Sequence, residues 1–72
     1  MVTEVFAVIE TFGDPRRTEV MGVYESGLDA LSYDAGRFKW LPVDDEPVIF
    51  EGQPLAPSRF GDSCRIEKWE IA

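Results

Sequence analysis

The first stretch of the chain alternates little between apolar and polar positions. Residues Glu4–Thr11 read Glu-Val-Phe-Ala-Val-Ile-Glu-Thr, which places apolar side chains on both faces of an extended strand. This pattern is typical of a strand that is covered on both sides, so we expect it in the interior of a sheet. Turn-forming and charged residues follow at 12–17, and a strand pattern resumes at 18–25. The two segments together predict a β-hairpin with a loop of about five residues.

A short helix is expected to begin at Ser26. The serine oxygen can accept a hydrogen bond from the amide of Asp29, and the aspartate can reach back to the serine amide, as in a capping box. Apolar residues then recur at helical spacing, at Leu28, Leu31 and Ala35. Gly36 supplies a residue that can adopt the left-handed conformation and end the helix. Since about ten residues are too few for a helix to be stable alone, this helix must pack on the sheet.

The second half of the chain is predicted as short strands joined by turns. Segment 37–41 alternates cationic and apolar residues, as a short half-exposed strand or an extended segment does, and segment 48–51 is predicted to be a short strand. An acidic turn at 44–47 separates them, and a loop rich in proline and glycine follows at 52–63. The last segment, 64–71, mixes charged and apolar residues without clean alternation, which indicates a bulge or an exposed edge strand.

This order of elements predicts a single α+β domain over residues 1–72. We expect an antiparallel sheet of four to five strands with one short helix packed on one face, in ββαβ(β) order. A domain of this size buries only about 60% of the surface that its unfolded chain exposes, so a large enclosed active site is not expected. The predicted core consists of Val5, Ala7, Ile9, Val20, Val23, Leu28, Leu31, Trp40, Ile49, Ile66 and Trp69.

Composition restricts the chemistry that this domain can perform. The chain has 14 Asp and Glu residues, 7 Lys and Arg residues and no histidine, and its net charge is -7. Histidine is the side chain whose unperturbed pKa allows proton exchange near neutral pH, so the most common general base is missing. The single cysteine, Cys64, has no histidine partner, and a buried or edge thiol is the expected role. We therefore expect no enzyme and no catalytic residue.

The adjacent carboxylates Asp44, Asp45 and Glu46 could serve as an acid and a base or bind a cation. Glycosidase-type chemistry needs a cleft between carboxylates held ~5 to 9.5 Å apart, which a small domain rarely provides. The run lacks the alternating acidic spacing and mid-loop glycine of an EF-hand, and the residues for a zinc site are missing. No metal site and no cofactor are therefore expected, although weak surface binding of Ca²⁺ or Mg²⁺ stays open.

The sequence also restricts the compartment. The longest uninterrupted apolar run, Val5–Ile9, is far shorter than the roughly 20 residues of a membrane-spanning helix. A lone cysteine cannot form an internal disulfide, which suits a reducing compartment, and no charged leader with an apolar core opens the sequence. We expect a cytoplasmic protein, located in the host cytoplasm if a phage encodes it, with no membrane contact.

The acidic excess has two interpretations, which are solubility alone and complementarity to a basic partner. Duplex DNA, with one negative charge per ~1.7 Å of axis, would repel this chain, so no direct nucleic-acid binding is expected. A domain of this size spans roughly 29 Å, over which duplex DNA presents about 17 phosphates. The carboxylates of this chain could therefore imitate part of a row of DNA phosphates. We expect the protein to be a monomer or a weak dimer. The candidate partner-binding residues are Asp44, Asp45, Glu46, Glu67 and Glu70.

An apolar interface is the alternative to an acidic one. In that case the exposed aromatic side chains Phe38, Phe50 and Phe60 are the better candidates, because aromatic residues are enriched among binding hot spots.

Two resemblances add to these expectations. The segment Gly22-Val-Tyr-Glu-Ser26 before a helix, with an apolar first strand and Ile66-Glu-Lys-Trp-Glu-Ile71 at the end, resembles small uncharacterised bacterial and phage ββαβ proteins. Residues 37–63 depart from that pattern, and the resemblance implies a fold but no activity.

In size, acidity and lack of catalytic residues the chain also resembles phage-encoded anti-CRISPR proteins and other DNA mimics. This resemblance implies an inhibitor that occupies the basic DNA-binding surface of a CRISPR surveillance complex by steric and electrostatic exclusion. The alternative is a host-encoded adaptor or structural module whose acidity only keeps it soluble.

Overall fold

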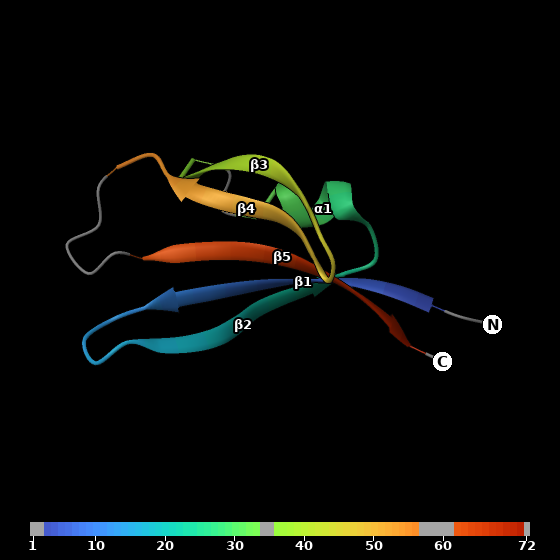
Figure 1. Cartoon of the computed structure of the whole chain (residues 1–72), viewed down its shortest axis with the longest axis horizontal. Helices are drawn as coiled ribbons and strands as arrows, with labels where there is room; N and C mark the ends of the chain where they lie inside the picture. The colour runs from blue at the N-terminus through green and yellow to red at the C-terminus, as the bar shows by residue number, and fades with distance from the viewer. Residues whose placement is uncertain (1–2, 34–35, 57–61, 72) are drawn as a thin grey trace.

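The computed structural model describes residues 3–33, 36–56 and 62–71. These residues form β1 (Thr3–Phe12), β2 (Arg17–Tyr24), α1 (Gly27–Leu31), β3 (Phe38–Asp45), β4 (Val48–Pro54) and β5 (Ser63–Ile71). The strands make one antiparallel sheet in the order β2-β1-β5-β4-β3 (Figure 1). The predicted α+β class, with five strands and one short helix between β2 and β3, is therefore confirmed.

The last strand, β5, joins two hairpins into one sheet. β1 pairs with β2, and β3 pairs with β4. β5 lies between them, paired with β1 on one side and with β4 on the other. β1 is thus an inner strand, as predicted, whereas the prediction of an exposed edge at 64–71 is wrong. The bulge lies in the neighbouring strand instead, because the register between β4 and β5 shifts around Ile49.

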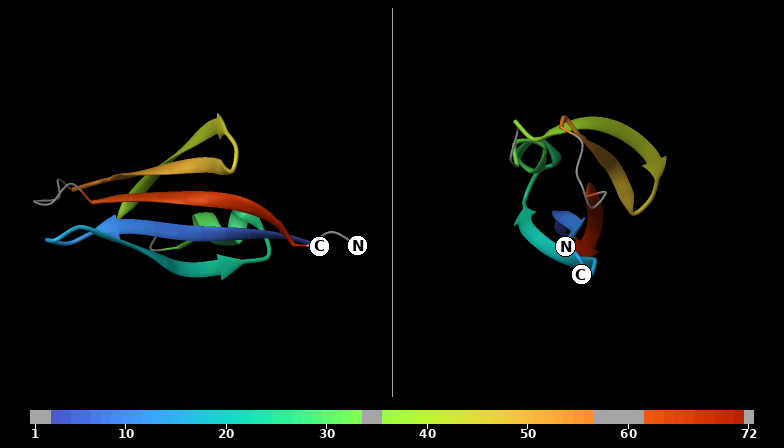
Figure 2. Two further views of the ribbon diagram at one scale, coloured as in Figure 1. Left: turned by 60° about the horizontal axis from the view of Figure 1, so that its bottom comes forward. Right: turned by 90° about the vertical axis from the view of Figure 1, so that its left-hand side faces the viewer.

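The sheet curls around α1. Figure 2 shows the helix in the gap between the two edge strands, β2 and β3, so that it closes the open side of the curl. The molecule is elongated, with extents of 43 × 23 × 20 Å. β1 begins and β5 ends at one end of the long axis, and the β1–β2 turn lies at the other end (Figure 1).

The core lies between α1 and the inner face of the sheet. Its buried members are Val8, Ala30, Phe38, Cys64 and Ile66, against which Phe6, Tyr24, Leu31, Tyr33, Trp40, Ile49 and Phe50 pack. Because side chains alternate along a strand, Phe6 and Val8 point into the curl while Ala7 and Ile9 point to the outer face. Ala7 and Ile9 are nevertheless buried among their neighbours on the sheet, so β1 is covered on both faces, as its sequence predicted.

Part of the predicted core is exposed instead, namely Val20, Val23, Leu28 and Trp69. Val20 lies opposite Ile9 and Val23 lies opposite Ala7, so both valines belong to the outer face of the sheet. No layer of the described residues covers that face. The apolar pattern of β1 and β2 identified two faces but could not tell which of them the helix would cover.

The helix begins as predicted but ends earlier. Ser26 is its N-cap, and the serine Oγ accepts a hydrogen bond of 3.1 Å from the amide of Asp29. The helix ends at Leu31, where Ser32 caps it and donates its hydroxyl to the carbonyl of Asp29 at 2.6 Å. The predicted stop at Gly36 is therefore wrong, since the helix has already ended, and the predicted helical residue Ala35 lies outside the described residues.

β3 and β4 are longer than the segments predicted at 37–41 and 48–51. β3 continues through Pro42, which an edge strand tolerates because one side of it forms no backbone ladder. β4 continues into the predicted loop through Gly52, which lies opposite Trp40. A Cβ atom at Gly52 would meet Cζ3 of Trp40 at 2.8 Å, so glycine is what lets the indole ring lie on β4. The part of the predicted loop at 57–61 lies outside the described residues.

Candidate partner-binding surface

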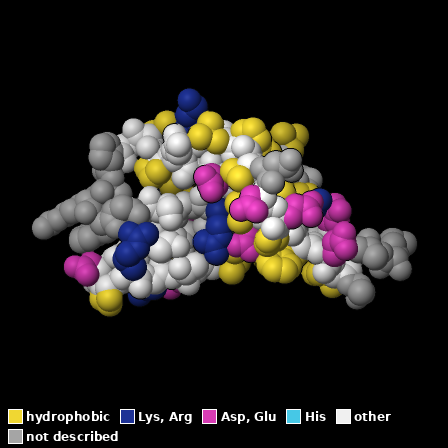
Figure 3. All heavy atoms as spheres, viewed as in Figure 1, with side chains coloured by type: hydrophobic (Ala, Val, Ile, Leu, Met, Phe, Trp, Pro, Cys, Tyr) yellow, Lys and Arg dark blue, Asp and Glu magenta, His cyan; other side chains and the backbone are white. Residues whose placement is uncertain are grey.

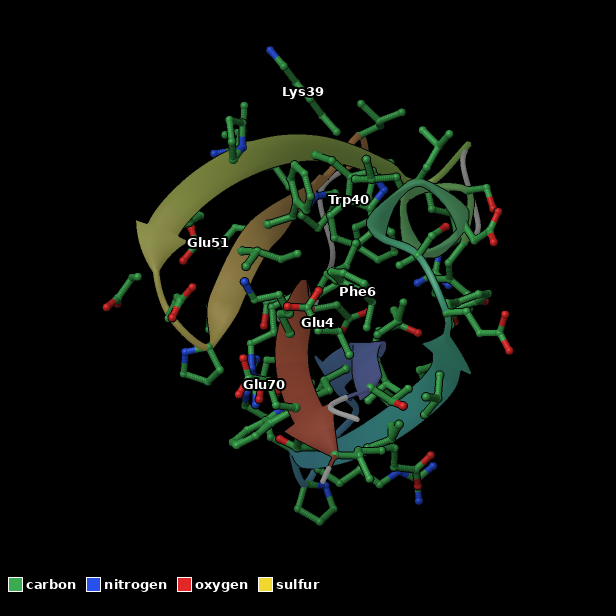
Figure 4. All side chains as sticks on the ribbon, turned by 90° about the vertical axis from the view of Figure 1, so that its right-hand side faces the viewer. Glu4, Phe6, Lys39, Trp40, Glu51 and Glu70 are labelled. Atoms are coloured by element: carbon green, nitrogen blue, oxygen red, sulfur yellow. The ribbon has the colours of Figure 1, made fainter. Side chains whose placement is uncertain are left out.

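Carboxylates from three segments gather at the end of the sheet where β1 begins and β5 ends. Glu4 lies directly opposite Glu70 on adjacent strands. Glu46, in the β3–β4 turn, binds Lys68 of β5 with an Nζ–Oε1 distance of 3.3 Å. Figure 3 shows acidic side chains gathered toward this end, and Figure 4 shows Glu4 and Glu70 close together when it is viewed end on. We call Glu4, Glu46 and Glu70 the acidic end.

Lys68 is the cation that these carboxylates share. Its hydrogen bond with Glu46 raises its pKa most, and the negative charges of Glu46, Glu4 and Glu70 raise that pKa further, while burial acts in the opposite direction. One ammonium group cannot balance three carboxylates, and Lys68–Glu46 is the only ion pair found for them among the described residues. Like charges directly opposite on adjacent strands are destabilising, so the Glu4–Glu70 pair costs the isolated protein stability.

The fold brings together one residue from each of the two predicted acidic sets, Glu46 and Glu70. The amide of Lys68 donates to the carbonyl of Pro47 at 2.8 Å, which holds the β3–β4 turn against β5. As a result Glu46 and Glu70 line one surface hollow of ≈ 460 Å³, together with Pro47, Lys68 and Trp69. Glu4 was not predicted as a contact, because only the pairing of β1 with β5 places it beside Glu70.

The two acidic residues that precede Glu46 belong to β3, so the prediction of a turn at 44–47 is wrong for them. Asp45 ends β3 and is exposed to solvent. Asp44 belongs to the same strand, and its side chain lies outside the described part of the structure.

Glu67 does not have the exposure expected of a partner contact. Its residue is only 7% exposed. One carboxylate oxygen accepts a hydrogen bond of 3.0 Å from Nε1 of Trp69, and the other accepts from Nε of Arg65. These three residues alternate along β5, so their side chains share the outer face of the sheet. The carboxylate of Glu67 therefore holds side chains of its own strand, and its geometry does not support the predicted contact.

The aromatic side chains are also placed differently from the prediction. Phe38 is buried and Phe50 is half-buried, and both contribute to the core. The prediction that they are exposed is therefore wrong, and Phe60 lies outside the described residues. Trp69, which was predicted to be in the core, is half exposed. Strand alternation could have indicated this, since Trp69 stands two residues from the charged Glu67 on the same face.

A second buried carboxylate, Glu10, ties the segment after α1 to the sheet. It accepts hydrogen bonds of 2.9 Å from the hydroxyl of Tyr33 and 3.0 Å from Nη2 of Arg37. Cys64 lies opposite Glu10 on β5. Burial, and after it the charge of Glu10, raises the pKa of the Cys64 thiol to about 12. The thiol is thus buried, as predicted, and protonated at neutral pH.

Among the described residues, no group of three acidic, cysteine or histidine side chains is arranged to hold a metal ion. In the same part of the chain, no helix has the length and apolar character needed to cross a membrane. No family model, no curated protein and no solved structure matches this chain. Its function is therefore inferred from its own residues.

Proposed function

We propose that this protein is a small non-catalytic binding protein whose acidic end attaches to a basic surface of another protein. The observation that carries this proposal is the convergence of Glu4, Glu46 and Glu70 on one lysine. The repulsion between Glu4 and Glu70 costs stability in the free protein, and Lys or Arg side chains of a partner would relieve it. Complementary charge of this kind guides encounter and excludes partners of the wrong sign.

The side chains that could perform chemistry support a binding role. The chain has no histidine, and its one thiol has a pKa of about 12 because of burial and the charge of Glu10. The buried carboxylates Glu10 and Glu67 are both occupied by hydrogen bonds within the chain. None of these groups combines access to solvent with a partner that would activate it.

The profile that this chain shares with anti-CRISPR proteins and other DNA mimics extends the proposal to an inhibitor. In that role the acidic end meets the lysine and arginine residues with which a CRISPR surveillance complex holds DNA phosphates. Binding there excludes DNA sterically and electrostatically, and no covalent bond changes. The alternative, an adaptor whose acidity serves only solubility, requires that the position of the carboxylates be unimportant.

A pair of charge-matched variants separates these functions. The first variant carries Glu4→Lys and Glu70→Lys at the acidic end, and the control carries Asp14→Lys and Glu19→Lys in the β1–β2 hairpin at the opposite end. Each changes the net charge from -7 to -3, because two negative charges are removed and two positive ones are added. All four side chains are exposed, so both variants should fold.

The measurement is competition with DNA for a purified CRISPR surveillance complex at low and moderate salt. We expect the wild-type protein and the hairpin control to compete, with weakening as salt screens the contact, and the acidic-end variant to compete poorly. Equal behaviour of the two variants would mean that only net charge matters. A wild-type protein that neither binds the complex nor displaces DNA would overturn the inhibitor proposal for that target.

A further inference from the structure

The outer face of strands β2, β1 and β5 exposes several apolar side chains. Val20 is 61% exposed, Val23 62%, Trp69 50% and Ile71 54%. The register sets Val20 and Val23 on one side of β1 and Trp69 and Ile71 on its other side, all on one face of the sheet. α1 packs on the opposite face, inside the curl (Figure 2). We call Val5, Val20, Val23, Trp69 and Ile71 the outer apolar face.

Trp69 is already oriented on this face without a partner. Its Nε1 donates to the buried carboxylate of Glu67, whose other oxygen binds Arg65. A half-exposed indole that is held in this way loses little conformational freedom when a partner covers it. Tryptophan is also among the residues most enriched at binding hot spots. The geometry of β5 thus makes Trp69 the natural anchor of an interface.

The surrounding charges determine what can cover this face. Trp69 lines the same hollow as Glu46 and Glu70, so the outer apolar face borders the acidic end. Of the cations next to it, Arg65 is paired with Glu67 and Lys68 with Glu46. A second copy of this chain would bring its own net charge of -7, and the repulsion opposes such a dimer.

We infer that the outer apolar face, with Trp69 as its anchor, docks an apolar patch of a partner protein that is bordered by arginine or lysine. The sign of the partner's charge rests on the proposed function. The inference adds which surface of this chain the partner contacts. Apolar contact supplies a desolvated centre, while the acidic end meets the cations at the border.

The probe for this docking is a synthetic amphipathic peptide with leucines on one helical face and arginines along its borders. One control peptide has glutamate in place of arginine, and a second has serine in place of leucine. Binding is followed by NMR, since the chain has only two tryptophans and each gives a separate indole N–H signal. We expect the leucine–arginine peptide to bind best, and to shift the Trp69 signal more than the Trp40 signal.

Variants locate the contact. Trp69→Ala and Val23→Ser should each weaken binding of the leucine–arginine peptide by about tenfold or more, as the loss of an interface anchor does. Leu28→Ser is the matched control, because Leu28 is 79% exposed but lies on α1, away from the outer apolar face. This control should leave the affinity unchanged.

The possible outcomes separate the two proposals. Unchanged affinity in Trp69→Ala and Val23→Ser, with loss of binding on charge reversal of Glu4 and Glu70, would overturn the docking face and leave the proposed function standing. Loss of binding in Trp69→Ala and Val23→Ser, with unchanged affinity on charge reversal of Glu4 and Glu70, would keep the docking face and overturn the proposed function. Equal binding of the leucine–glutamate peptide, no binding of the leucine–arginine peptide, or a wild-type dimer in sedimentation that Val23→Ser dissociates would each overturn the inference.

Discussion

Nε1 of Trp69 donates a hydrogen bond of 3.0 Å to the buried carboxylate of Glu67, two residues earlier on the same strand. The other oxygen of that carboxylate binds Arg65, so one acid fixes two neighbouring side chains of β5. The indole ring that is held in this way stands where the outer apolar face meets the acidic end. β5 therefore links the two surfaces through which we propose that the protein binds.

Replacing Glu67 tests this link. Glu67→Ala removes the acceptor for Trp69 and leaves the guanidinium of Arg65 without its partner, which should lower the free energy of unfolding by roughly 1 to 3 kcal/mol. The indole N–H of Trp69 should exchange with solvent faster and shift in NMR spectra. Glu67→Gln is the control, because its amide oxygen can still accept from Trp69, and its effect should be smaller. Unchanged indole exchange in Glu67→Ala would show that the carboxylate does not hold the ring.

Glu70→Gln should make the free protein more stable and the complex weaker. The change removes a repulsion across β1 and β5, and such a pair is worth roughly 0.2 to 1 kcal/mol. Glu70 contributes least to the raised pKa of Lys68, so little attraction is lost. The control is Glu51→Gln, since Glu51 lies opposite Arg65 and its loss removes a favourable pair. Urea unfolding measures the free energy of unfolding of both variants. If Glu70→Gln is less stable than the wild-type protein, the assignment of Glu4 and Glu70 as a repulsive pair is contradicted.

Alkaline pH should destabilise the protein through Cys64. Burial and the charge of Glu10 raise the pKa of the thiol from 9.0 to about 12, so the folded state holds the proton more tightly than the unfolded state does. The stabilisation from this group is complete below pH 9.0 and is lost as the pH rises toward about 12. Through this one group, the free energy of unfolding cannot fall by more than about 1.4 kcal/mol per pH unit.

Two measurements check the role of Cys64. Denaturant unfolding at increasing pH should show a steeper loss of stability in the wild-type protein than in Cys64→Ala, while Lys68 contributes to both alike. Cys64→Ser should retain partner binding, because the thiol takes no part in it. A native thiol that reacts with iodoacetamide as fast as the unfolded one would contradict its burial.

Ser26→Ala should lower the free energy of unfolding by about 1 kcal/mol, since the amide of Asp29 loses the oxygen that caps it. Ser63→Ala, at an exposed position that begins β5, is the control and should have almost no effect. An unchanged urea midpoint in Ser26→Ala would mean that the cap adds nothing to a helix that tertiary packing already holds.

Local chemistry explains what could be predicted from the sequence. The N-cap at Ser26 follows from a side chain that reaches an amide three residues ahead, and the inner position of β1 follows from apolar residues on both of its faces. The early end of α1 is also local, since the hydroxyl of Ser32 competes for the carbonyl of Asp29. The helix therefore ends before Gly36, where the sequence pattern predicts the stop.

Long-range pairing explains most of what could not be predicted. Glu4 and Glu70 meet only because β1 and β5, from opposite ends of the chain, pair in a particular register. The exposure of Val23 depends on which way the sheet curls, and the burial of Glu67 depends on two neighbours that bind it. Each of these is decided by tertiary structure rather than by the spacing of residues along a strand.

The most direct test of the acidic end is the ratio of two affinities for the surveillance complex. The two proteins compared are Glu4→Lys/Glu70→Lys and Asp14→Lys/Glu19→Lys, which have the same net charge of -3 because each exchanges two negative for two positive charges. We predict that the acidic-end variant binds at least about tenfold more weakly than the hairpin variant, a difference of about 1.4 kcal/mol. Equal affinities of two folded variants would contradict a localised acidic interface.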